Sequence, residues 1–371
     1  MSDIREVDIA RGEPDFHTPD HIKLAAHRAI DQNFTKYTPQ PGIRELREAI
    51  AAKFEAENGF HAEPDDIVVS CGGKHSVAQA IRCVLGSGDE ALLVTPHWSM
   101  YPGQVKLAGG RPVLVKASEE RGFVPAIAAI REGITGRTRL IILNSPANPT
   151  GAVYPRALLE QVAELVLENN LYVLSDEVYE HIVFDGAKHV SIASLDKDVA
   201  QRTITVNSVS KTHAMTGWRI GYAAFPKGLA ARATDIQLHS TSAPCAVSQR
   251  AALAALTGDS SHIAMMLAAY VQRRALVLER IGKIPGLSIN PPLGTFYAFV
   301  NIEGLIGRDV RGRQLDNADA FTALLQKEAR VRVLSGTPFG ADSHVRLSFA
   351  VSYADLEEGL RRTASLLEEG V

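Results

Sequence analysis

The sequence has little that points to a disulfide-bonded, membrane-bound or nucleic-acid-binding protein. Its 371 residues include only three cysteines, which are widely spaced and form no CxxC pair: Cys71, Cys83 and Cys245. That pattern argues against a disulfide framework and against a structural zinc site. The 39 lysines and arginines are outnumbered by 42 aspartates and glutamates, for a formal net charge of −3. We therefore expect no nucleic-acid partner and no anionic membrane surface as a partner.

Long hydrophobic runs are also missing. The first ten residues, MSDIREVDIA, contain no apolar stretch of signal-peptide length, and no segment approaches the length of a membrane span. We expect a cytoplasmic protein. The apolar content of 46% and the charged content of 22% are ordinary for a globular chain, and this length allows two hydrophobic cores.

Short apolar runs alternate with helical patterns between about residues 40 and 255. Helices are predicted at 47–59 and 156–170, among others. The predicted strands are 66–70, 90–96, 111–117, 139–146, 171–177 and 203–208. Such alternation predicts an α/β fold, in which a largely parallel sheet is covered by helices on both faces.

The pattern changes after about residue 255. A long helix is predicted at 260–283, strands follow it, and the capping pattern Ser352-x-x-Asp355 opens a last helix. This indicates a smaller α+β domain, against which the N-terminal strand VDIARG packs. We predict a large cofactor-binding domain at 38–270 and a small domain, made of 1–37 and 271–371, that closes over the substrate.

Two polar side chains stand where predicted strands end. Asp176 ends an apolar strand, and Tyr179 follows three residues later, close enough to present a phenol beside the carboxylate. An aspartate at this point also suits a helix N-cap. Asn148 lies in NSPANPTG (144–151), a turn stiffened by proline, where its amide either points in a fixed direction or bonds its own backbone.

One further predicted strand ends at a turn suited to anion binding, and another is followed by an aromatic residue. Gly72 and Gly73 lead from a strand into a helix, where glycine allows close approach and the free N–H groups bind anions. Neither the GxxxxGK[ST] spacing nor GxGxxG is present there, so the segment is not a P-loop or a dinucleotide fingerprint. Trp98 is either a core residue or a side chain that stacks on a flat heterocycle.

The segment NSVSKTHAMTGWRIGY (207–222) completes this set. Its Ser208, Ser210 and Arg219 are donors suited to a phosphate monoester, and Lys211 is an amine able to form a Schiff base. Asp176 suits a pyridine nitrogen, and Tyr179 and Asn148 suit a ring oxygen. One ligand needs an amine, a phosphate site, a carboxylate and a flat ring partner together, so the predicted cofactor is pyridoxal 5'-phosphate.

Many stretches, in order, resemble the class I/II aminotransferases of fold type I, and most closely the prokaryotic-type aspartate aminotransferase subgroup. The resemblance runs from residue 11 almost to the C-terminus. The stretches are RGEPDFHTP, KYTPQPGIRELREAI, VVSCGGKHSVAQAI, TPHWSMYPG, ILNSPANPTGAVYP, LSDEVYEHIVFDG, SVSKTHAMTGWRIGY and VRLSFA. It implies a pyridoxal-phosphate-dependent transaminase with a large mostly parallel mixed sheet and a smaller α+β domain.

The resemblance also implies roles for individual residues. Lys211 is the Schiff-base lysine and the base that moves the α-proton, Asp176 holds the pyridine nitrogen, and Trp98 stacks on the ring. Tyr179 and Asn148 contact the ring oxygen. The phosphate is held by Gly73, Lys74 (through its backbone), Ser208, Ser210 and Arg219.

Five residues are implied to meet the substrate or a second subunit. Tyr37 matches a tyrosine that reaches the phosphate of the neighbouring subunit, which implies a homodimer with shared active sites. Arg346 matches the arginine that pairs with the substrate α-carboxylate, a task that suits a bidentate fork. Gly12 matches a glycine whose backbone lies against the substrate, and Trp98 and Asn148 lie near it.

The identity of the substrate rests on Lys74. A lysine in this GGK context matches members that accept dicarboxylic amino acids, which favours aspartate or glutamate as donor and a 2-oxo acid such as 2-oxoglutarate as acceptor. An exposed lysine in the first helical turn is the alternative, although the helix dipole disfavours a cation there. An aromatic or aliphatic amino-acid aminotransferase, or a C–S β-lyase on the same scaffold, remains the alternative function.

Three residues depart from the pattern of the family. Arg11 stands where an uncharged residue is usual, and either points inward with Val7 and Ile9 or is a charge at a strand end. His97 and His213 either line the pocket or are structural. No metal-ligand spacing accompanies them, so no metal is expected.

Overall fold

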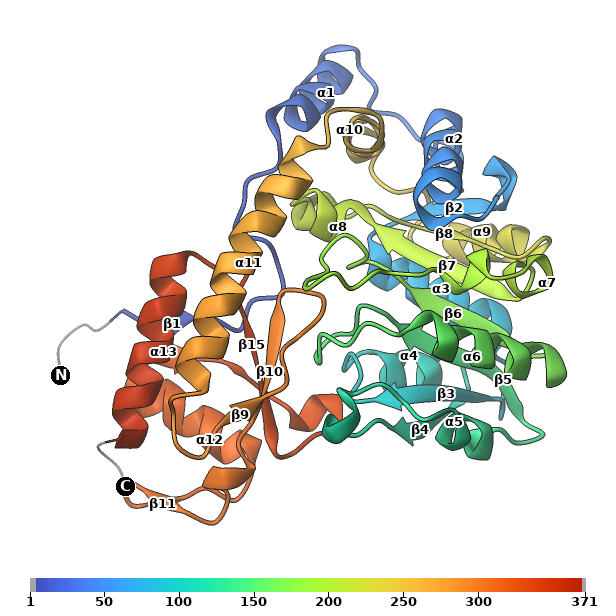
Figure 1. The fold of residues 1–371 in the computed structure, drawn as a ribbon. Coiled ribbons are helices and arrows are strands. Elements are labelled where there is room, and N and C mark those ends of the chain that lie inside the picture. The colour runs from blue at the N-terminus through green and yellow to red at the C-terminus, as the bar shows by residue number, and fades with distance from the viewer. Residues whose placement is uncertain (1–4, 369–371) are drawn as a thin grey trace.

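The structure, a computed structural model, describes residues 5–368 (Figure 1). A seven-stranded sheet with helices on both faces forms one part, and a four-stranded sheet with helices forms a smaller part. The predicted α/β fold, with a large mostly parallel mixed sheet and a smaller α+β domain, is confirmed.

The large sheet has the strand order β2-β8-β7-β6-β5-β3-β4. All neighbouring pairs are parallel except those of β8, which runs antiparallel to both β2 and β7. In chain order the strands are β2 (Ile67–Ser70), β3 (Glu90–Thr95), β4 (Arg111–Lys116), β5 (Thr138–Asn144), β6 (Tyr172–Asp176), β7 (Thr203–Ser208) and β8 (Gly221–Ala224). The carboxyl ends of the parallel strands therefore meet at one edge, where open α/β sheets bind ligands.

Alternate residues of the central strands enter different cores, as the period of two requires. Leu92 of β3 packs with α5 (Ile127–Gly133) and α6 (Arg156–Glu168) on one face. Its neighbour Leu93 packs on the other face, whose helices are α3 (Gly73–Val84), α4 (Tyr101–Leu107) and α9 (Leu229–Leu238). Burial on both faces explains why these strands read as continuous apolar runs.

The smaller part is built on an antiparallel sheet of order β14-β15-β10-β9. Its strands are β9 (Ser288–Ile289), β10 (Tyr297–Asn301), β14 (Leu334–Ser335) and β15 (His344–Ser348). One core cluster joins this sheet to α11 (Ser261–Ile281), α12 (Ala318–Leu324) and α13 (Tyr353–Glu368). The short pairs β1 (Val7–Asp8) with β13 (Val331–Arg332) and β11 (Asp309–Val310) with β12 (Arg313–Gln314) complete it.

Most predicted helices and strands are confirmed. The predicted glycine stop and the predicted capping residue are found at the ends of their helices. The helix predicted at 47–59 is α2 (Arg44–Lys53) with a π-helical turn, and it ends at Gly59 with φ 72°. The hydroxyl of Ser352 accepts a hydrogen bond from the backbone N–H of Asp355 at 3.1 Å, which caps α13. The antiparallel strand β8 was not predicted.

Two helices bear on the predicted domain boundaries. Helix α1 (Asp20–Asp31) was assigned to the small domain, but its Ile22 and Ala26 pack in one core with α2 and α10 (Ala246–Thr257), on the side of the large sheet. The predicted boundary at residue 270 falls inside α11, a continuous helix of 21 residues that runs between the two parts (Figure 1). Two short helices, α7 (Lys197–Ala200) and α8 (Val209–Thr212), flank β7.

Among residues 5–368, no helix combines the length and the apolar character that a membrane crossing requires.

Candidate active site

Functional side chains gather at the carboxyl edge of the large sheet because each follows the end of a strand. Gly73 starts α3 directly after β2, and Trp98 follows β3. Asn148 follows β5, Asp176 ends β6, and Ser208 ends β7. Parallel strands thus bring together residues that lie far apart in the chain.

These residues line a cavity of about 510 Å³ between the large sheet and the smaller part. Twelve of the predicted site residues line it: Gly12, Gly73, Lys74, Trp98, Asn148, Asp176, Tyr179, Ser208, Ser210, Lys211, Arg219 and Arg346. Tyr37 does not line it, and its side chain is 96% exposed. Arg11 does line it.

The start of α3 is shaped for close approach of a ligand. Gly72 has φ 91°, and a Cβ there would lie 2.4 Å from Nη2 of Arg219. A Cβ on Gly221 of β8 would lie 2.3 Å from the backbone N of Gly73. The helix N-terminus, the Ser208 and Ser210 hydroxyls and Arg219 therefore surround one end of the cavity, and these are donors that suit an anion.

Asp176 is buried at the end of β6, and its Oδ1 accepts a long hydrogen bond, 3.5 Å, from the backbone N–H of Val178. The hydroxyl of Tyr101, the first residue of α4, donates to its Oδ2 at 2.6 Å. Burial raises the pKa of the Asp176 carboxyl to about 6, although the Tyr101 hydrogen bond acts in the opposite direction. A cationic partner in the cavity stabilises the ionised form of such a carboxyl group. Trp98 packs edge-on against Tyr101, with ring centroids 5.2 Å apart.

Lys211 lies in α8 and points its amine toward the N-terminal segment. Its Nζ donates a hydrogen bond to the carbonyl oxygen of Gly12. Burial lowers the pKa of the Lys211 ammonium, and the nearby Arg346 cation lowers it further. A lowered pKa gives the lysine a larger neutral fraction, which a nucleophile and a base both require.

Arg346 of β15 reaches the cavity from the smaller part. Its Nη1 donates to Oδ1 of Asn148 and its Nη2 to the carbonyl oxygen of Ala10, each at 3.0 Å. Its guanidinium carbon lies 4.1 Å from the ring centroid of Tyr297. Each Nη group carries a second N–H beyond these bonds, so this guanidinium keeps donors for a ligand.

Two tyrosines of the site were missed by the sequence analysis. Tyr101 bonds Asp176, and the hydroxyl of Tyr297 lies 3.0 Å from that of Tyr179. Burial raises the pKa of Tyr179 well above its ordinary value, and the Tyr297 hydroxyl adds to this effect. The spacing Trp98-x-x-Tyr101 placed Tyr101 near the site, but no pattern indicated which carboxylate it would meet.

Arg11, His97 and His213, the three residues that depart from the family pattern, have different surroundings. Arg11 is largely exposed, with its Nε 3.3 Å from Oδ2 of Asp8. His97 is buried outside the main cavity, and burial lowers the pKa of its imidazole. Nδ1 of His213 lies 2.9 Å from Nε2 of His262, and burial lowers the pKa of His213 to about 3. Both His97 and His213 are therefore neutral at pH 7.

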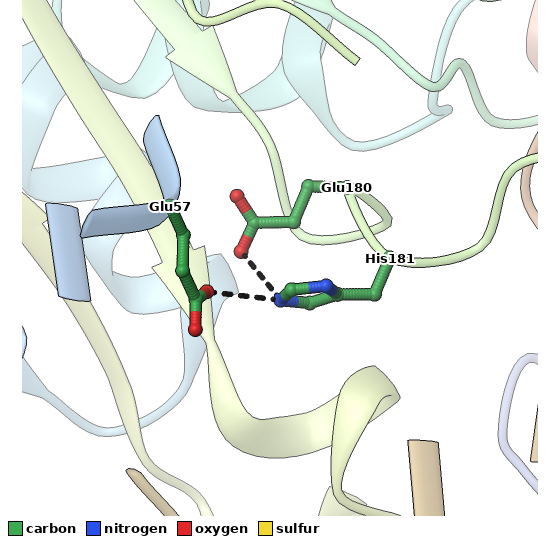
Figure 2. A group of neighbouring side chains, drawn as sticks. All are labelled: Glu57, Glu180 and His181. Carbon is green, nitrogen blue, oxygen red and sulfur yellow. Dashed lines mark ion pairs between the residues drawn. The ribbon is translucent and has the colours of Figure 1, made fainter. Parts of the chain in front are cut away.

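A buried ionic network lies behind the cavity. Glu180 accepts hydrogen bonds from Lys53, from Nδ2 of Asn58 at 2.6 Å and from Nδ2 of Asn207 at 2.7 Å. Figure 2 shows Glu57 and Glu180 converging on Nε2 of His181, at 3.2 and 3.4 Å. The Lys53 ammonium is the largest favourable influence on the Glu180 carboxyl, whose pKa is lowered to about 2 despite its burial.

This network fixes the segments that carry the site residues. Asn207 accepts a hydrogen bond from the backbone N–H of Ser208 at 2.7 Å, and Glu180 is the neighbour of Tyr179. An internal ammonium already lies against the carboxylates, so we interpret the cluster as a structural support for the cavity and not as a metal site.

The fold and the cavity indicate the class of protein: a two-part α/β enzyme with a lysine, a buried carboxylate and an anion site at the carboxyl edge of its sheet. The profile of the family "Aminotransferase class I and II" matches residues 5–362. The aspartate aminotransferase of Geobacillus stearothermophilus is 41% identical over 362 residues, which cover 98% of this chain and 91% of that protein.

Solved structures agree. The crystal structure of the aspartate aminotransferase from Rhizobium meliloti superposes with a TM-score of 0.96 at 38% identity, covering 99% of this chain and 92% of that one. The aromatic aminotransferase from Pyrococcus horikoshii gives 0.92 at 41% identity, covering 100% and 97%. The chain belongs to the class I and II aminotransferases, which are pyridoxal-phosphate-dependent enzymes.

Proposed function

We propose that this aminotransferase binds pyridoxal 5'-phosphate in the 510 Å³ cavity and moves an amino group from a dicarboxylic amino acid, aspartate or glutamate, to a 2-oxo acid such as 2-oxoglutarate. The observation that carries the proposal is the convergence of Lys211, Asp176 and Arg346 on one cavity. An amine, a buried carboxylate and a guanidinium with a free donor are what this transfer requires.

The residues present fit the cofactor. The start of α3 and Arg219 leave no room for a Cβ on Gly72, and they form a cradle of donors for the phosphate. Asp176 is a buried carboxyl with a raised pKa, which a ring N–H would satisfy. Trp98 supplies a flat face, and the hydroxyl of Tyr179 and the amide of Asn148 supply donors for the ring oxygen.

Side chains of this protein transfer the proton and orient the substrate. When bound, the cofactor withdraws electrons from the α-carbon of the amino acid, which makes the α-proton removable. The neutral Lys211 amine takes that proton and returns it at another carbon. Arg346 pairs with the α-carboxylate, with Asn148 beside it and the Gly12 carbonyl nearby, and this fixes the orientation of the α-carbon.

The dicarboxylic preference rests on Lys74 and on the relatives. Lys74 lines the cavity, with its Nζ 5.5 Å from the Trp98 ring centroid. A cation there suits the distal carboxylate of aspartate or glutamate. The name of the Geobacillus relative, aspartate aminotransferase, supports the same substrate class.

A second candidate is an aromatic amino-acid aminotransferase, which the Pyrococcus horikoshii structure favours. Leu334 and Phe339 of the smaller part line the same cavity and offer apolar contacts to such a side chain. The two candidates differ only in the donor, so a comparison of donors separates them.

We also propose a cytoplasmic homodimer in which Tyr37 completes the phosphate site of the partner subunit. The full exposure of a large aromatic side chain and its position outside its own cavity support this role. The smaller part, with Gly12 and Arg346, is proposed to close over the substrate. Its boundaries follow the prediction, except that residues 20–31 are moved to the large domain.

The test is the visible absorption spectrum of the protein loaded with pyridoxal phosphate. Aspartate should convert the band of the lysine-bound cofactor, and 2-oxoglutarate should restore it. Lys211→Ala should lack the lysine-bound band. Absence of any cofactor band in the wild-type protein would reject the proposal, and release of pyruvate and thiol from a sulfur amino acid without an acceptor would favour the β-lyase.

A further inference from the structure

The cavity contains more cationic groups than the cofactor and the α-carboxylate use. Five basic side chains line it: Arg11, Lys74, Lys211, Arg219 and Arg346. Lys211 and Arg346 donate to carbonyl or amide oxygens, as described above. Arg219 donates to the carbonyl oxygens of Thr216 at 2.8 Å and of Cys71 at 3.3 Å. Within residues 5–368, Arg11 and Lys74 are the two whose charged ends are not bonded in this way.

The acidic groups do not balance these two cations. Asp176 and Glu13 are the acids that line the cavity within residues 5–368. Asp176 is bonded to Tyr101 and faces the proposed ring site. Glu13 accepts a hydrogen bond from the Thr216 hydroxyl at 2.9 Å. One further anion is therefore expected from the substrate.

The guanidinium of Arg11 is available to bind such an anion. Only its Nε is engaged, 3.3 Å from Oδ2 of Asp8, and the side chain is 61% exposed. Its two Nη groups have no hydrogen-bond or ion-pair partner among residues 5–368. That leaves the forked end, which binds carboxylates in a bidentate manner, free at the cavity wall.

We propose that Arg11 is a specificity-determining residue that binds the distal carboxylate of dicarboxylic substrates together with Lys74. This inference rests on the proposed function and deepens it. A transaminase binds two substrates in turn in one cavity, and the carbon chains of aspartate and 2-oxoglutarate differ in length by one methylene group. Arg11 has a long stem and a single weak tether, so its guanidinium can follow the carboxylate of either substrate, whereas Lys74 lies over the Trp98 ring.

The chain offers a matched control. Arg332 of β13 also lies near Asp8, with its Nη1 3.7 Å from Oδ2, and its side chain is 51% exposed. It does not line the cavity. Arg11→Ala and Arg332→Ala therefore remove the same charge from the same partner, and they differ only in access to the substrate.

The experiment uses the cofactor-loaded enzyme and two readouts. The first is the dissociation constant of succinate, a dicarboxylate without an amino group, measured by calorimetry. The second is the single-turnover conversion of the cofactor band by aspartate, by glutamate and by alanine. Arg11→Ala should weaken succinate binding and lower kcat/KM for both acidic donors by about 10- to 100-fold, the usual range for a hydrogen-bonded charge.

The specificity of the effect decides the outcome. Alanine conversion should change less than about threefold in Arg11→Ala, Arg11→Lys should lie between the two, and Arg332→Ala should match the wild type. Equal losses for alanine and aspartate, or unchanged succinate binding, would overturn the role of Arg11. Failure of every amino acid to convert the wild-type band would instead overturn the proposed function, so the two failures are distinguishable.

Discussion

The hydroxyl of Tyr101 donates a 2.6 Å hydrogen bond to Oδ2 of Asp176, and both side chains are buried. The two residues lie 75 positions apart, at the start of α4 and the end of β6. This bond occupies one carboxylate oxygen and sets the orientation of the other. It also lowers the pKa of a carboxyl that burial raises.

The first prediction concerns the pH dependence of the stability of the cofactor-free protein. The pKa of Asp176 is raised from 3.8 to about 6 on folding, so between these values the folded chain binds a proton that the unfolded chain has lost. The contribution of Asp176 to the free energy of unfolding should therefore fall as pH rises through this window, by about 3 kcal/mol in all.

Chemical denaturation of the wild type and Asp176→Asn at pH 4 to 7 measures this difference. The wild type should lose stability relative to the variant as pH rises, and the difference should level off above pH 6. Tyr101→Phe should extend the window to higher pH, because the lost hydrogen bond favoured the ionised form. A difference that is independent of pH would contradict the assignment.

The second prediction concerns the fork of Arg346. Arg346→Lys keeps the charge but loses the planar donors that bond Asn148 and Ala10. We expect kcat/KM for the amino donor to fall about 10- to 100-fold, since one or two hydrogen bonds to charged groups are lost. The absorption band of the bound cofactor should be unchanged, and its loss would show that Arg346 supports the cofactor site instead.

The third prediction concerns the contact between β8 and the start of α3. A Cβ at residue 221 would lie 2.3 Å from the backbone N of Gly73, and backbone cannot rotate away. Gly221→Ala should therefore destabilise the fold by about 1–3 kcal/mol and weaken pyridoxal phosphate binding in a fluorescence titration. Gly103→Ala in α4, where a Cβ would meet nothing within 4 Å, is the control. Equal cofactor affinity in both variants would disprove the contact's role.

The fourth prediction concerns the buried network around Glu180, the carboxylate that Figure 2 shows beside His181. Lys53→Met leaves the Glu180 carboxylate without its ammonium partner, and removing one partner of a buried pair costs about 3–5 kcal/mol. Denaturant titration of this variant should show that loss. Lys283→Met, which removes an exposed pair with Glu279, should change the free energy of unfolding by less than about 1 kcal/mol.

Sequence patterns were sufficient for the parts of the site that follow one strand each. Asp176 and Ser208 stand at strand ends, and Gly73 stands at a helix start, so periodicity and turn chemistry located them. Tyr101 and Tyr297 were missed because their roles depend on which strands are neighbours, and the pattern of one segment carries no information on sheet order. The order β6-β5-β3 is what brings Tyr101 to Asp176.

The proposed domain boundaries depend on contacts that one segment of the sequence does not show. Helix α1 precedes the large sheet in the chain and reads as an ordinary amphipathic helix, so its packing against α10 depends on contacts far along the sequence. Helix α11 was itself predicted, at 260–283, and it spans the proposed boundary at residue 270. For Arg11 the sequence left two positions open, inward beside Val7 and Ile9 or a charge at a strand end, and the structure has the second, with the side chain 61% exposed.

The buried ionic network around Glu180 restricts which substitutions this enzyme can accept during evolution. Lys53, Asn58, Glu180 and Asn207 come from separate segments of the chain and meet in one buried network. Replacing any one of them passes through a protein with an unmatched interior charge or donor, which is less stable than either the original or a fully apolar substitute. These four positions should therefore be inherited as a unit, while the substrate contacts in front of them remain free to diversify one at a time.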